Sequence, residues 1–472
     1  MIPLTTCAGR TIAVFGLGRS GNATCRALLA GGATVAAFDD GAEARAAASR
    51  EGIPIVDLAA ADWSVFDSLL LAPGVPLTHP RPHWTVERAR SAGVEVIGDI
   101  ELFLRERRAV SPASEVVAIT GTNGKSTTTA LIGHLLADAG RSVEVGGNIG
   151  IATLGLAPFA DRAHYVLEVS SYQIDLTPSL DPTIGVLLNV TPDHIDRHGT
   201  FEAYARVKER LIEGARSAVV SLDDPVVTAI ANRRRHAGGA LKTFATIAGL
   251  SADLTLGPGG DVILREAPAA SAFQLSGIAS LRGAHNAQNA MAAIAVARLL
   301  GLDQATIQHG LEAFPGLAHR LEQVGTLAIP QGQVLFVNDS KATNADSTEK
   351  ALSAFPSAIY WIAGGRAKEG GIESLRALFP RVAHAYLIGE AAGAFKAALS
   401  GSCPCTLAGT IDAAVELATR DAIAAGAAEA VVLLSPACAS FDQFPNFEVR
   451  GEAFRSRVGA IPGVALAHGG DR

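Results

Sequence analysis

Short apolar runs alternate with helix-like segments along most of the chain. This rhythm predicts an α/β fold in which parallel strands alternate with helices. It divides the chain into three blocks, residues 1–105, 106–315 and 316–472. The predicted strands are 11–15 in the first block, 116–120 and 185–188 in the second, and 334–337, 358–363, 384–388 and 430–434 in the third.

The segment 105–115 (RERRAVSPASE) interrupts the apolar rhythm. It is polar and contains a proline, which disfavours a regular element. We therefore interpret it as a linker between the first two blocks.

Composition narrows the class of protein. A chain of 472 residues is too long for one hydrophobic core. The net charge of −7 does not favour a nucleic-acid binder. The start of the chain lacks the pattern of a secretory signal, and no apolar run reaches the ~20 residues of a membrane span. Five scattered cysteines without zinc-site spacing fit reduced thiols, so we expect a cytoplasmic protein.

A first glycine loop, Gly16 to Gly21 (GLGRSG), follows a predicted strand, and Asp39 ends the next one. This context fits a dinucleotide site and, taken alone, predicts an oxidoreductase. The same backbone can hold any nucleotide diphosphate, or it can be a tight turn without a ligand. The loop alone therefore does not identify the ligand or cofactor.

A second glycine loop, Gly121 to Thr127 (GTNGKST), follows the strand 116–120 and precedes a predicted helix over 127–139. It departs from the strict phosphate-loop pattern because Ile119 stands where the first glycine should be. Its backbone N–H groups, Lys125 and the Ser126 hydroxyl can still hold ATP phosphates and Mg²⁺. The alternative is a polar turn with a solvated lysine.

Three later residues suit a metal-assisted phosphoryl site, although each also has a plain structural interpretation. Glu168 lies in an apolar run, where a carboxylate is costly unless it is paired, binds metal or ends the strand in solvent. His194 follows the strand 185–188, at the edge where α/β sites form. Lys208 lies on a predicted amphipathic helix over 201–212 and could be a solvated helix lysine.

Taken together, these motifs resemble the Mur ligase family of peptidoglycan synthesis over almost the whole chain. The segments GTNGKST, LEVSSYQ, NVTPDHIDRH, YARVKERL and GAHNAQN occur in the family's order. The segments 338–344 (NDSKATN) and 435–451 (SPACASFDQFPNFEVRG) are most similar to the member that adds D-glutamate. The D-N-P-R motif of the diaminopimelate-adding member is not found.

The resemblance implies an N-terminal Rossmann-like domain for the UDP part of the substrate. It also implies a central P-loop ATPase-like domain and a C-terminal Rossmann-like domain for the amino acid. The implied reaction joins D-glutamate to UDP-N-acetylmuramoyl-L-alanine through an acyl phosphate, with ATP as co-substrate. We expect a monomer with small-molecule substrates and no nucleic-acid partner.

The resemblance also assigns roles to individual residues. The implied catalytic residues are Lys125, His194 and Lys208. Ser126 and Glu168 would bind Mg²⁺, and His194 and a Lys208 carbamate would serve a second Mg²⁺. The implied ATP-binding residues are Gly121, Thr122, Asn123, Gly124, Lys125, Ser126, Thr127, Asn286, Asn289, Arg320, Asp339 and Lys341.

The resemblance also implies binding residues for the two remaining substrates. The UDP-substrate residues are Arg19, Ser20, Asp39, Gly74 and Asn148, and the D-glutamate residues are Thr343, Lys368, Ser440 and Phe447. One departure concerns uracil, because Asp40-Gly41 follows Asp39 where relatives can place Thr-Arg. The alternatives are another Mur-type or folylpolyglutamate-type ligase, or an oxidoreductase built on Gly16 to Gly21.

Overall fold

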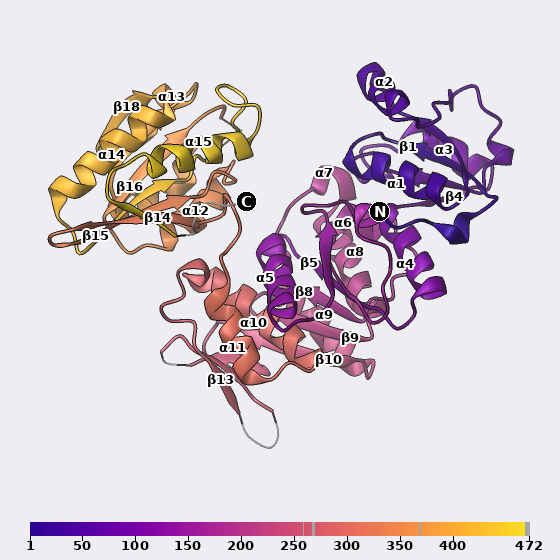
Figure 1. The fold of residues 1–472 in the computed structure, drawn as a ribbon, viewed down its shortest axis with the longest axis horizontal. Coiled ribbons are helices and arrows are strands. Elements are labelled where there is room, and N and C mark those ends of the chain that lie inside the picture. Colours follow the sequence, from indigo (N-terminus) through magenta and orange to yellow (C-terminus); the bar gives the residue numbers. More distant parts are fainter. Residues whose placement is uncertain (258, 267–269, 368–369, 468–472) are drawn as a thin grey trace. The chain divides into compact units, whose positions relative to one another are not determined.

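Apolar strands form three sheets, one in each block of the sequence, and helices flank them (Figure 1). The structure is a computed structural model, and it describes residues 1–257, 259–266, 270–367 and 370–467. The three helix-flanked sheets confirm the predicted α/β class.

The first sheet has the strand order β2-β1-β3-β4, and all its pairings are parallel. Its strands are almost wholly apolar because parallel sheets are covered on both faces. The elements are η1 Thr5–Cys7, β1 Thr11–Phe15, α1 Arg19–Ala30, β2 Thr34–Phe38, α2 Ala42–Arg50, η2 Trp63–Val65, β3 Ser68–Leu71, α3 Trp84–Ser91, β4 Glu95–Ile97 and α4 Asp99–Val110.

The second sheet has the order β13-β12-β11-β10-β9-β8-β5-β7-β6. Its strands are β5 Glu115–Thr120, β6 Val143–Gly147, β7 His164–Glu168, β8 Ile184–Leu187, β9 Ser217–Ser221, β10 Ala240–Ala245, β11 Leu254–Leu256, β12 Val262–Leu264 and β13 Ser271–Phe273. Its helices are α5 Lys125–Asp138, η3 Thr153–Gly155, α6 Ser171–Asp175, α7 Ile195–His198, α8 Phe201–Gly214, α9 Pro225–His236, η4 Ala279–Leu281, α10 Ala284–Leu299 and α11 Gln304–Ala313.

The third sheet has the order β18-β17-β16-β19-β15-β14-β20. Its strands are β14 Glu322–Ile329, β15 Gly332–Asn338, β16 Ile359–Gly364, β17 Val382–Ile388, β18 Cys405–Gly409, β19 Glu429–Leu434 and β20 Val464–Leu466. Its helices are α12 Ala345–Ser353, η5 Glu373–Arg381, α13 Ala392–Leu399, α14 Ile411–Ala425 and α15 Phe447–Gly459.

The expectation of parallel pairing is wrong at one end of each larger sheet. β11, β12 and β13 pair antiparallel, and so do β14, β15 and β20. The β14–β15 connection contains only residues 330 and 331. A connection that short can only turn the chain back, since a parallel crossover needs a dozen residues or more.

The segment 105–115 is not a linker, because α4 continues to Val110. Two of its charged side chains have partners far away in sequence. The buried Glu106 carboxylate accepts a hydrogen bond from the backbone N–H of Thr5 at 3.0 Å. Arg107 pairs with Asp181 at 2.7 Å. The polar helix end is therefore held by the first residues of the chain and by the second block.

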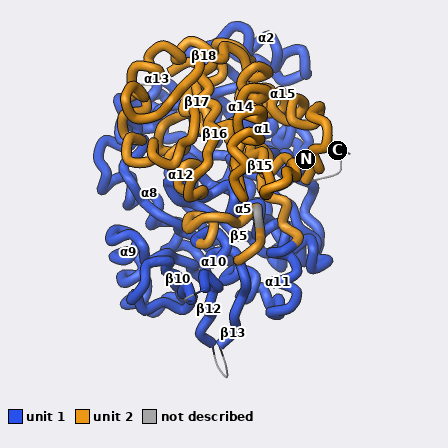
Figure 2. Tube along the Cα trace, turned by 90° about the vertical axis from the view of Figure 1, so that its left-hand side faces the viewer, with its two compact units in different colours: residues 1–275, 288–312 blue, residues 276–287, 313–472 orange. Residues whose placement is uncertain are grey.

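The described chain divides into two units, residues 1–275 with 288–312, and residues 276–287 with the remainder (Figure 2). The first unit holds the first and second sheets. The second unit holds the third sheet together with the segment that leads into α10. The boundaries at 105/106 and 315/316 stay predictions.

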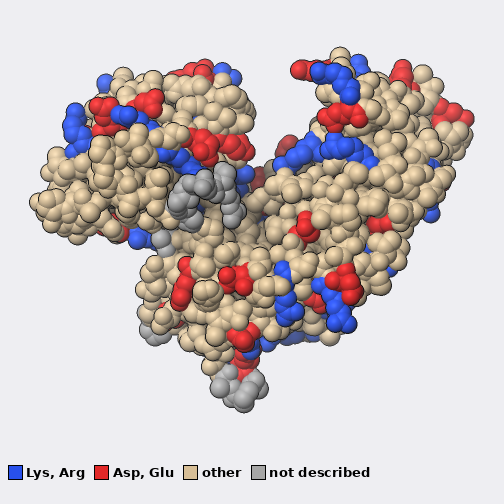
Figure 3. Space-filling view, viewed as in Figure 1, with Lys and Arg blue, Asp and Glu red and all other residues tan. Residues whose placement is uncertain are grey.

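Acidic and basic side chains are interspersed on the face seen in Figure 3, in keeping with the small net charge. Of the helices that the structure describes, none combines the length and the apolar character needed to cross a bilayer.

Candidate active site

The second glycine loop connects β5 to α5 and leaves the start of this helix accessible to an anion. Gly124 has a φ of +83°, which favours glycine. A Cβ atom at this position would also collide with Oδ1 of Asn289. Gly124 is the N-cap residue of α5 and, as a glycine, supplies no side-chain cap. The first N–H groups of α5 can therefore face a phosphate, which is the role that the sequence predicts.

Lys125 and Ser126 begin α5. Nζ of Lys125 donates to the carbonyl oxygens of Gly121 and Thr122, each at 2.9 Å. The ammonium group thus lies within the loop that would hold the phosphates. Asn123 is fixed by a bond of 2.8 Å from its N–H to the side chain of Asn189.

Lys208 on α8 is buried beneath this loop, with 1% of its surface exposed. Its Nζ donates to Oγ1 of Thr120 at 3.1 Å and to the carbonyl oxygen of Gly121 at 3.0 Å. Burial, followed by the charge of Lys125, lowers the pKa of Lys208 well below its ordinary value. The amine is therefore shifted toward its neutral, nucleophilic form.

Glu168 ends β7 and is 3% exposed. Its Oε1 accepts a bond of 2.8 Å from Nδ2 of Asn148, whereas its buried Oε2 has no hydrogen-bond partner among the described residues. Such an oxygen is costly unless a cation binds it, so Glu168 fits a Mg²⁺ ligand. No three His, Cys, Asp or Glu side chains in the described ranges form a metal site. The predicted set, which adds Ser126 and a modified Lys208, therefore stays a prediction.

His194 is the N-cap residue of α7 and has a φ of 54°, an uncommon value for a residue with a side chain. Its ring centroid lies 5.0 Å from that of Tyr172 and 6.5 Å from that of Tyr204. Nζ of Lys208 lies 4.8 Å from the same Tyr204 ring. The two predicted catalytic side chains thus both lie near the ring of Tyr204.

A second histidine, His198, was not singled out from the sequence. It is buried, its Nε2 lies 3.0 Å from Oγ of Ser171, and its ring stacks on Tyr172 at 5.5 Å. Burial, aided by the charges of His194 and Lys208, lowers the pKa of His198 to about 4. The spacing could have revealed it, because His198 follows His194 by one helical turn.

The first glycine loop is shaped by close packing. A Cβ atom on Gly16 would lie 2.5 Å from Cβ of Ala72, and one on Gly21 would collide with the carbonyl oxygen of Gly16. Oδ2 of Asp39 accepts a bond of 2.7 Å from the N–H of Leu17. Asp39 therefore fixes the loop that would hold a diphosphate.

The other predicted UDP-substrate residues lie around this loop. Arg19 and Ser20 begin α1, and Nη1 of Arg19 donates to the carbonyl oxygen of Gly150 at 2.8 Å. Asn148 lies in the same turn as Gly150 and contacts Glu168, as described above. The Asp40 side chain pairs with His83 at 3.3 Å.

In the second unit, the loops after β15 and β19 carry the residues predicted for the ribose and the amino acid. Oδ2 of Asp339 accepts a bond of 2.9 Å from Ser435, and Oδ1 accepts one of 3.2 Å from the N–H of Leu321. Nζ of Lys341 lies 4.6 Å from the centre of the Phe447 ring. Arg320 precedes β14, Thr343 lies on the loop after β15, and the buried Ser440 lies on the loop after β19; Lys368 lies outside the described residues.

Arg450 on α15 is a further residue that was missed. It is 1% exposed, and its Nη2 donates to the carbonyl oxygens of Ser340 at 2.8 Å and Cys438 at 3.1 Å. It therefore ties together the two loops that carry Asp339 and Ser440. A charged residue inside the motif 435–451 was the available signal, but its burial depends on contacts that the sequence does not display.

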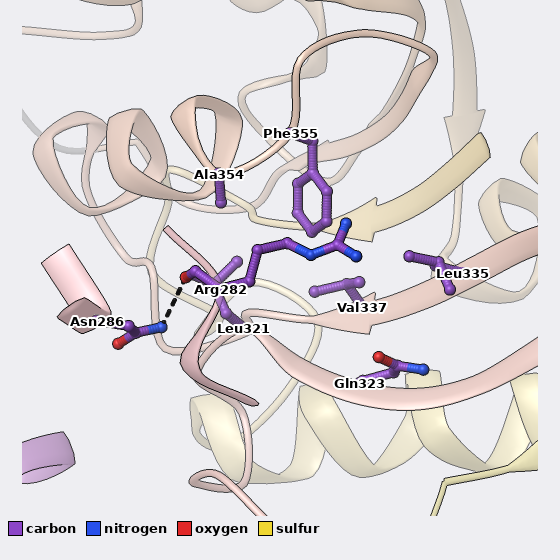
Figure 4. Close-up of a pocket in the computed structure, with 8 residues that line it drawn as sticks. All are labelled: Arg282, Asn286, Leu321, Gln323, Leu335, Val337, Ala354 and Phe355. Carbon is purple, nitrogen blue, oxygen red and sulfur yellow. Dashed lines mark hydrogen bonds between the residues drawn. The ribbon is translucent and has the colours of Figure 1, made fainter. Parts of the chain in front are cut away.

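Asn286 lies at a small pocket in the second unit (Figure 4). Its Nδ2 donates to the carbonyl oxygen of Arg282 at 3.0 Å. The Arg282 guanidinium lies 5.3 Å from the centre of the Phe355 ring and pairs with Glu429 at 2.6 Å. These contacts fix the segment that leads into α10, and an adenine contact by Asn286 stays a prediction.

Asp339 also predicts a pH dependence of stability. Burial raises the pKa of its carboxyl group to about 7, despite the bonds from Ser435 and Leu321. The folded state therefore prefers the neutral acid, and this contribution is lost as the pH rises from about 4 through 7. Relative to Asp339→Asn, the wild-type protein should lose about 2–3 kcal/mol of unfolding free energy between pH 5 and pH 8, measured by urea denaturation.

The exposed Asp303 provides the control for this measurement. Hydrogen bonds from Thr306 lower the pKa of the Asp303 carboxyl group, so it does not titrate between pH 5 and pH 8. Asp303→Asn should leave the pH dependence as in the wild type. An equal pH dependence in wild type and Asp339→Asn contradicts the assignment.

Comparisons with known proteins agree with this arrangement. The Mur ligase middle domain matches residues 119–297. Two proteins named UDP-N-acetylmuramoylalanine--D-glutamate ligase match nearly end to end. The one from Chelativorans sp. (strain BNC1) is 58% identical over 99% of both chains, and the one from Brucella abortus (strain 2308) is 54% identical over 100% of both.

Solved structures share the fold at low sequence identity. The UDP-N-acetylmuramate-alanine ligase MurC from Thermotoga maritima is 18% identical, with a TM-score of 0.57 over 96% of this chain and 99% of that chain. MurF from Acinetobacter baumannii is also 18% identical, with a TM-score of 0.57 over 97% of this chain and 93% of that chain.

Proposed function

Because the chain belongs to the Mur ligase family, we propose that it joins D-glutamate to UDP-N-acetylmuramoyl-L-alanine in peptidoglycan precursor synthesis. ATP is consumed, and ADP and phosphate are released. The observation that carries the proposal is the match over the full chain, at 54–58% identity, to proteins named for this reaction. The open glycine loop before α5, with Lys125 inside it, supports the use of ATP.

The reaction has two displacements. The L-alanyl carboxylate attacks the γ-phosphorus of ATP, which forms an acyl phosphate and releases ADP. The D-glutamate amine then attacks the acyl carbon, loses its proton and displaces phosphate. Lys125 would offset the charge of the two approaching anions, and the positioning of both would supply much of the rate.

Glu168 and the Ser126 hydroxyl would hold Mg²⁺, which would neutralise phosphate charge when bound. Two observations support the site. Oε2 of Glu168 has no hydrogen-bond partner among the described residues, and Ser126 lies in the first turn of α5.

Lys208 would carry a carbamate. Its neutral amine attacks CO₂, an N–C bond forms, and the proton leaves for solvent. The product is anionic and offers oxygen ligands to a cation, whereas an ammonium group repels one. The lowered pKa of Lys208 supports this step, and His194 would help to organise the same cation.

Two alternative functions can be tested by experiment. Another ligase of the family would transfer a different amino acid, and an oxidoreductase on the first glycine loop would bind nicotinamide. The structure favours the ligase because Lys125 lies within the second loop and Lys208 donates to the Gly121 carbonyl oxygen of that loop. In addition, Glu168 ends the neighbouring strand β7. The cytoplasmic location and the monomeric state of the enzyme stay predictions.

A substrate panel tests the proposal. Phosphate release from ATP is measured with UDP-N-acetylmuramoyl-L-alanine and, in turn, D-glutamate, L-glutamate, L-alanine, glycine and diaminopimelate. We expect D-glutamate to be preferred by at least about 100-fold in kcat/KM. L-Alanine and glycine lack the second carboxylate and would leave charged donors unpaired, whereas L-glutamate and diaminopimelate present their two carboxylates in a different arrangement around the amine. A preference for another amino acid, or turnover of nicotinamide, overturns it.

A further inference from the structure

We propose that Arg197 is a positioning residue that fixes the loop of residues 72–75, which would contact the UDP acceptor, to the α7 turn that carries His194. This inference rests on the proposed function, since it assumes that a UDP-linked acceptor binds beside the first glycine loop. Nothing in the family resemblance given above assigns a role to Arg197.

The guanidinium of Arg197 binds three consecutive carbonyl oxygens of that loop. Nη1 donates to Gly74 at 2.9 Å, and Nη2 donates to Val75 at 3.0 Å and to Pro73 at 3.4 Å. The guanidinium is also covered by an aromatic ring, because its central carbon lies 4.6 Å from the centre of the Tyr172 ring.

The guanidinium of Arg197 interacts with these carbonyl oxygens and not with a carboxylate of the described residues. Within the described ranges, no carboxylate lies within ion-pair distance of its guanidinium. A planar fork with several donors suits this task, whereas a lysine would present a single point charge. The contact therefore depends on the shape of the arginine head group.

The loop that Arg197 holds is part of the predicted acceptor site. It directly follows β3, and Ala72 at its start packs so closely on Gly16 that a Cβ there would lie 2.5 Å away. Gly74 is itself a predicted UDP-substrate residue. A shift of this loop would therefore displace the surface that packs on the first glycine loop, and the bound acceptor would shift with it.

The other end of the contact is the predicted catalytic turn. Arg197 lies on the four-residue helix α7, between His194 at its N-cap and His198 at its end. A second contact joins the same parts of the chain, because a Cβ on Gly199 would lie 2.6 Å from Nε2 of His79. Arg197 thus sets the distance between the acceptor loop and the catalytic turn, and small misplacements of reacting groups are costly.

The test compares Arg197→Lys with Arg234→Lys. Arg234 on α9 is the matched control, because it also donates to three backbone carbonyls, those of Glu213, Ala215 and Arg216, but is not part of the predicted site. We expect Arg197→Lys to raise the KM for UDP-N-acetylmuramoyl-L-alanine at least about tenfold, with the KM for ATP changed less than twofold. Arg234→Lys should leave both KM values unchanged.

A direct binding measurement separates this inference from the proposed function. Isothermal titration of the wild-type protein with UDP-N-acetylmuramoyl-L-alanine must show binding, and its absence would overturn the function. If the wild type binds and Arg197→Lys binds equally well, the inference alone is wrong. Should Arg197→Lys fail to fold by circular dichroism, Tyr172→Leu replaces it, and an unchanged acceptor affinity in that variant overturns the inference.

Discussion

Lys208→Ala should lower kcat by at least about 10³-fold, and short carboxylic acids such as acetate should restore part of the loss. The amine lies 3.0 Å from the Gly121 carbonyl oxygen, at the base of the phosphate loop. Removing it deletes the group that would become an anionic ligand at that point. A small carboxylate can enter the space left behind and supply oxygen ligands of the same charge. Phosphate release at saturating ATP and acceptor, with and without acetate, measures both effects.

The controls for Lys208 separate chemistry from folding. Lys242→Ala removes a lysine from β10 that pairs with Asp253 at 3.6 Å, and it should retain wild-type activity. Chloride at the ionic strength of the acetate sample should restore nothing. Full activity of unsupplemented Lys208→Ala would refute the carbamate, whereas lost activity without rescue would leave Lys208 with a structural role only.

Lys125→Met should lower kcat/KM for ATP by about 10²- to 10⁴-fold while leaving the fold intact. Methionine keeps most of the length and volume of the side chain but removes the charge. The substitution also removes the hydrogen bonds that Nζ donates to the carbonyl oxygens of Gly121 and Thr122, on the loop at the end of β5. Steady-state kinetics at varied ATP, together with thermal unfolding, measure the two quantities.

A surface lysine provides the comparison for this second prediction. Lys396 lies in the last turn of α13, and Lys396→Met should match the wild type in kcat/KM. If Lys125→Met loses less than about tenfold, the loop does not hold the reacting phosphates and the ATP assignment fails there.

Local patterns were sufficient to predict the strands beside the site. β1 occupies the predicted residues 11–15, and β5 adds only Glu115 to the predicted 116–120. The hydrophobic pattern of a strand and the residues of its flanking turns extend over a few positions, so they can be recognised in a single sequence. The antiparallel ends of the larger sheets are not predicted because, apart from 334–337, their strands are not among those that the apolar pattern indicates.

Burial of charged residues could not be predicted in the same way. Lys208 and Arg450 are each 1% exposed, but both donate to backbone carbonyl oxygens, which any sequence contains. The polar segment around Arg107 resembles a linker in the sequence because its partner Asp181, which lies far away along the chain, is not evident there. The sequence motifs indicated which residues gather at the phosphate loop, whereas their hydrogen bonds required the fold.

The attachment of the first residues has a consequence for how the protein can be divided. Ile2 is fully buried, and its N–H donates to the carbonyl oxygen of Leu154 in the second block at 3.0 Å. Glu106 holds Thr5 from the far end of the first block. A cut near residue 105 would expose Ile2 and leave Glu106 without its neighbours. The first two blocks should therefore melt together, and gene fusions or fragment libraries should keep residues 1–275 and 288–312 together as one piece.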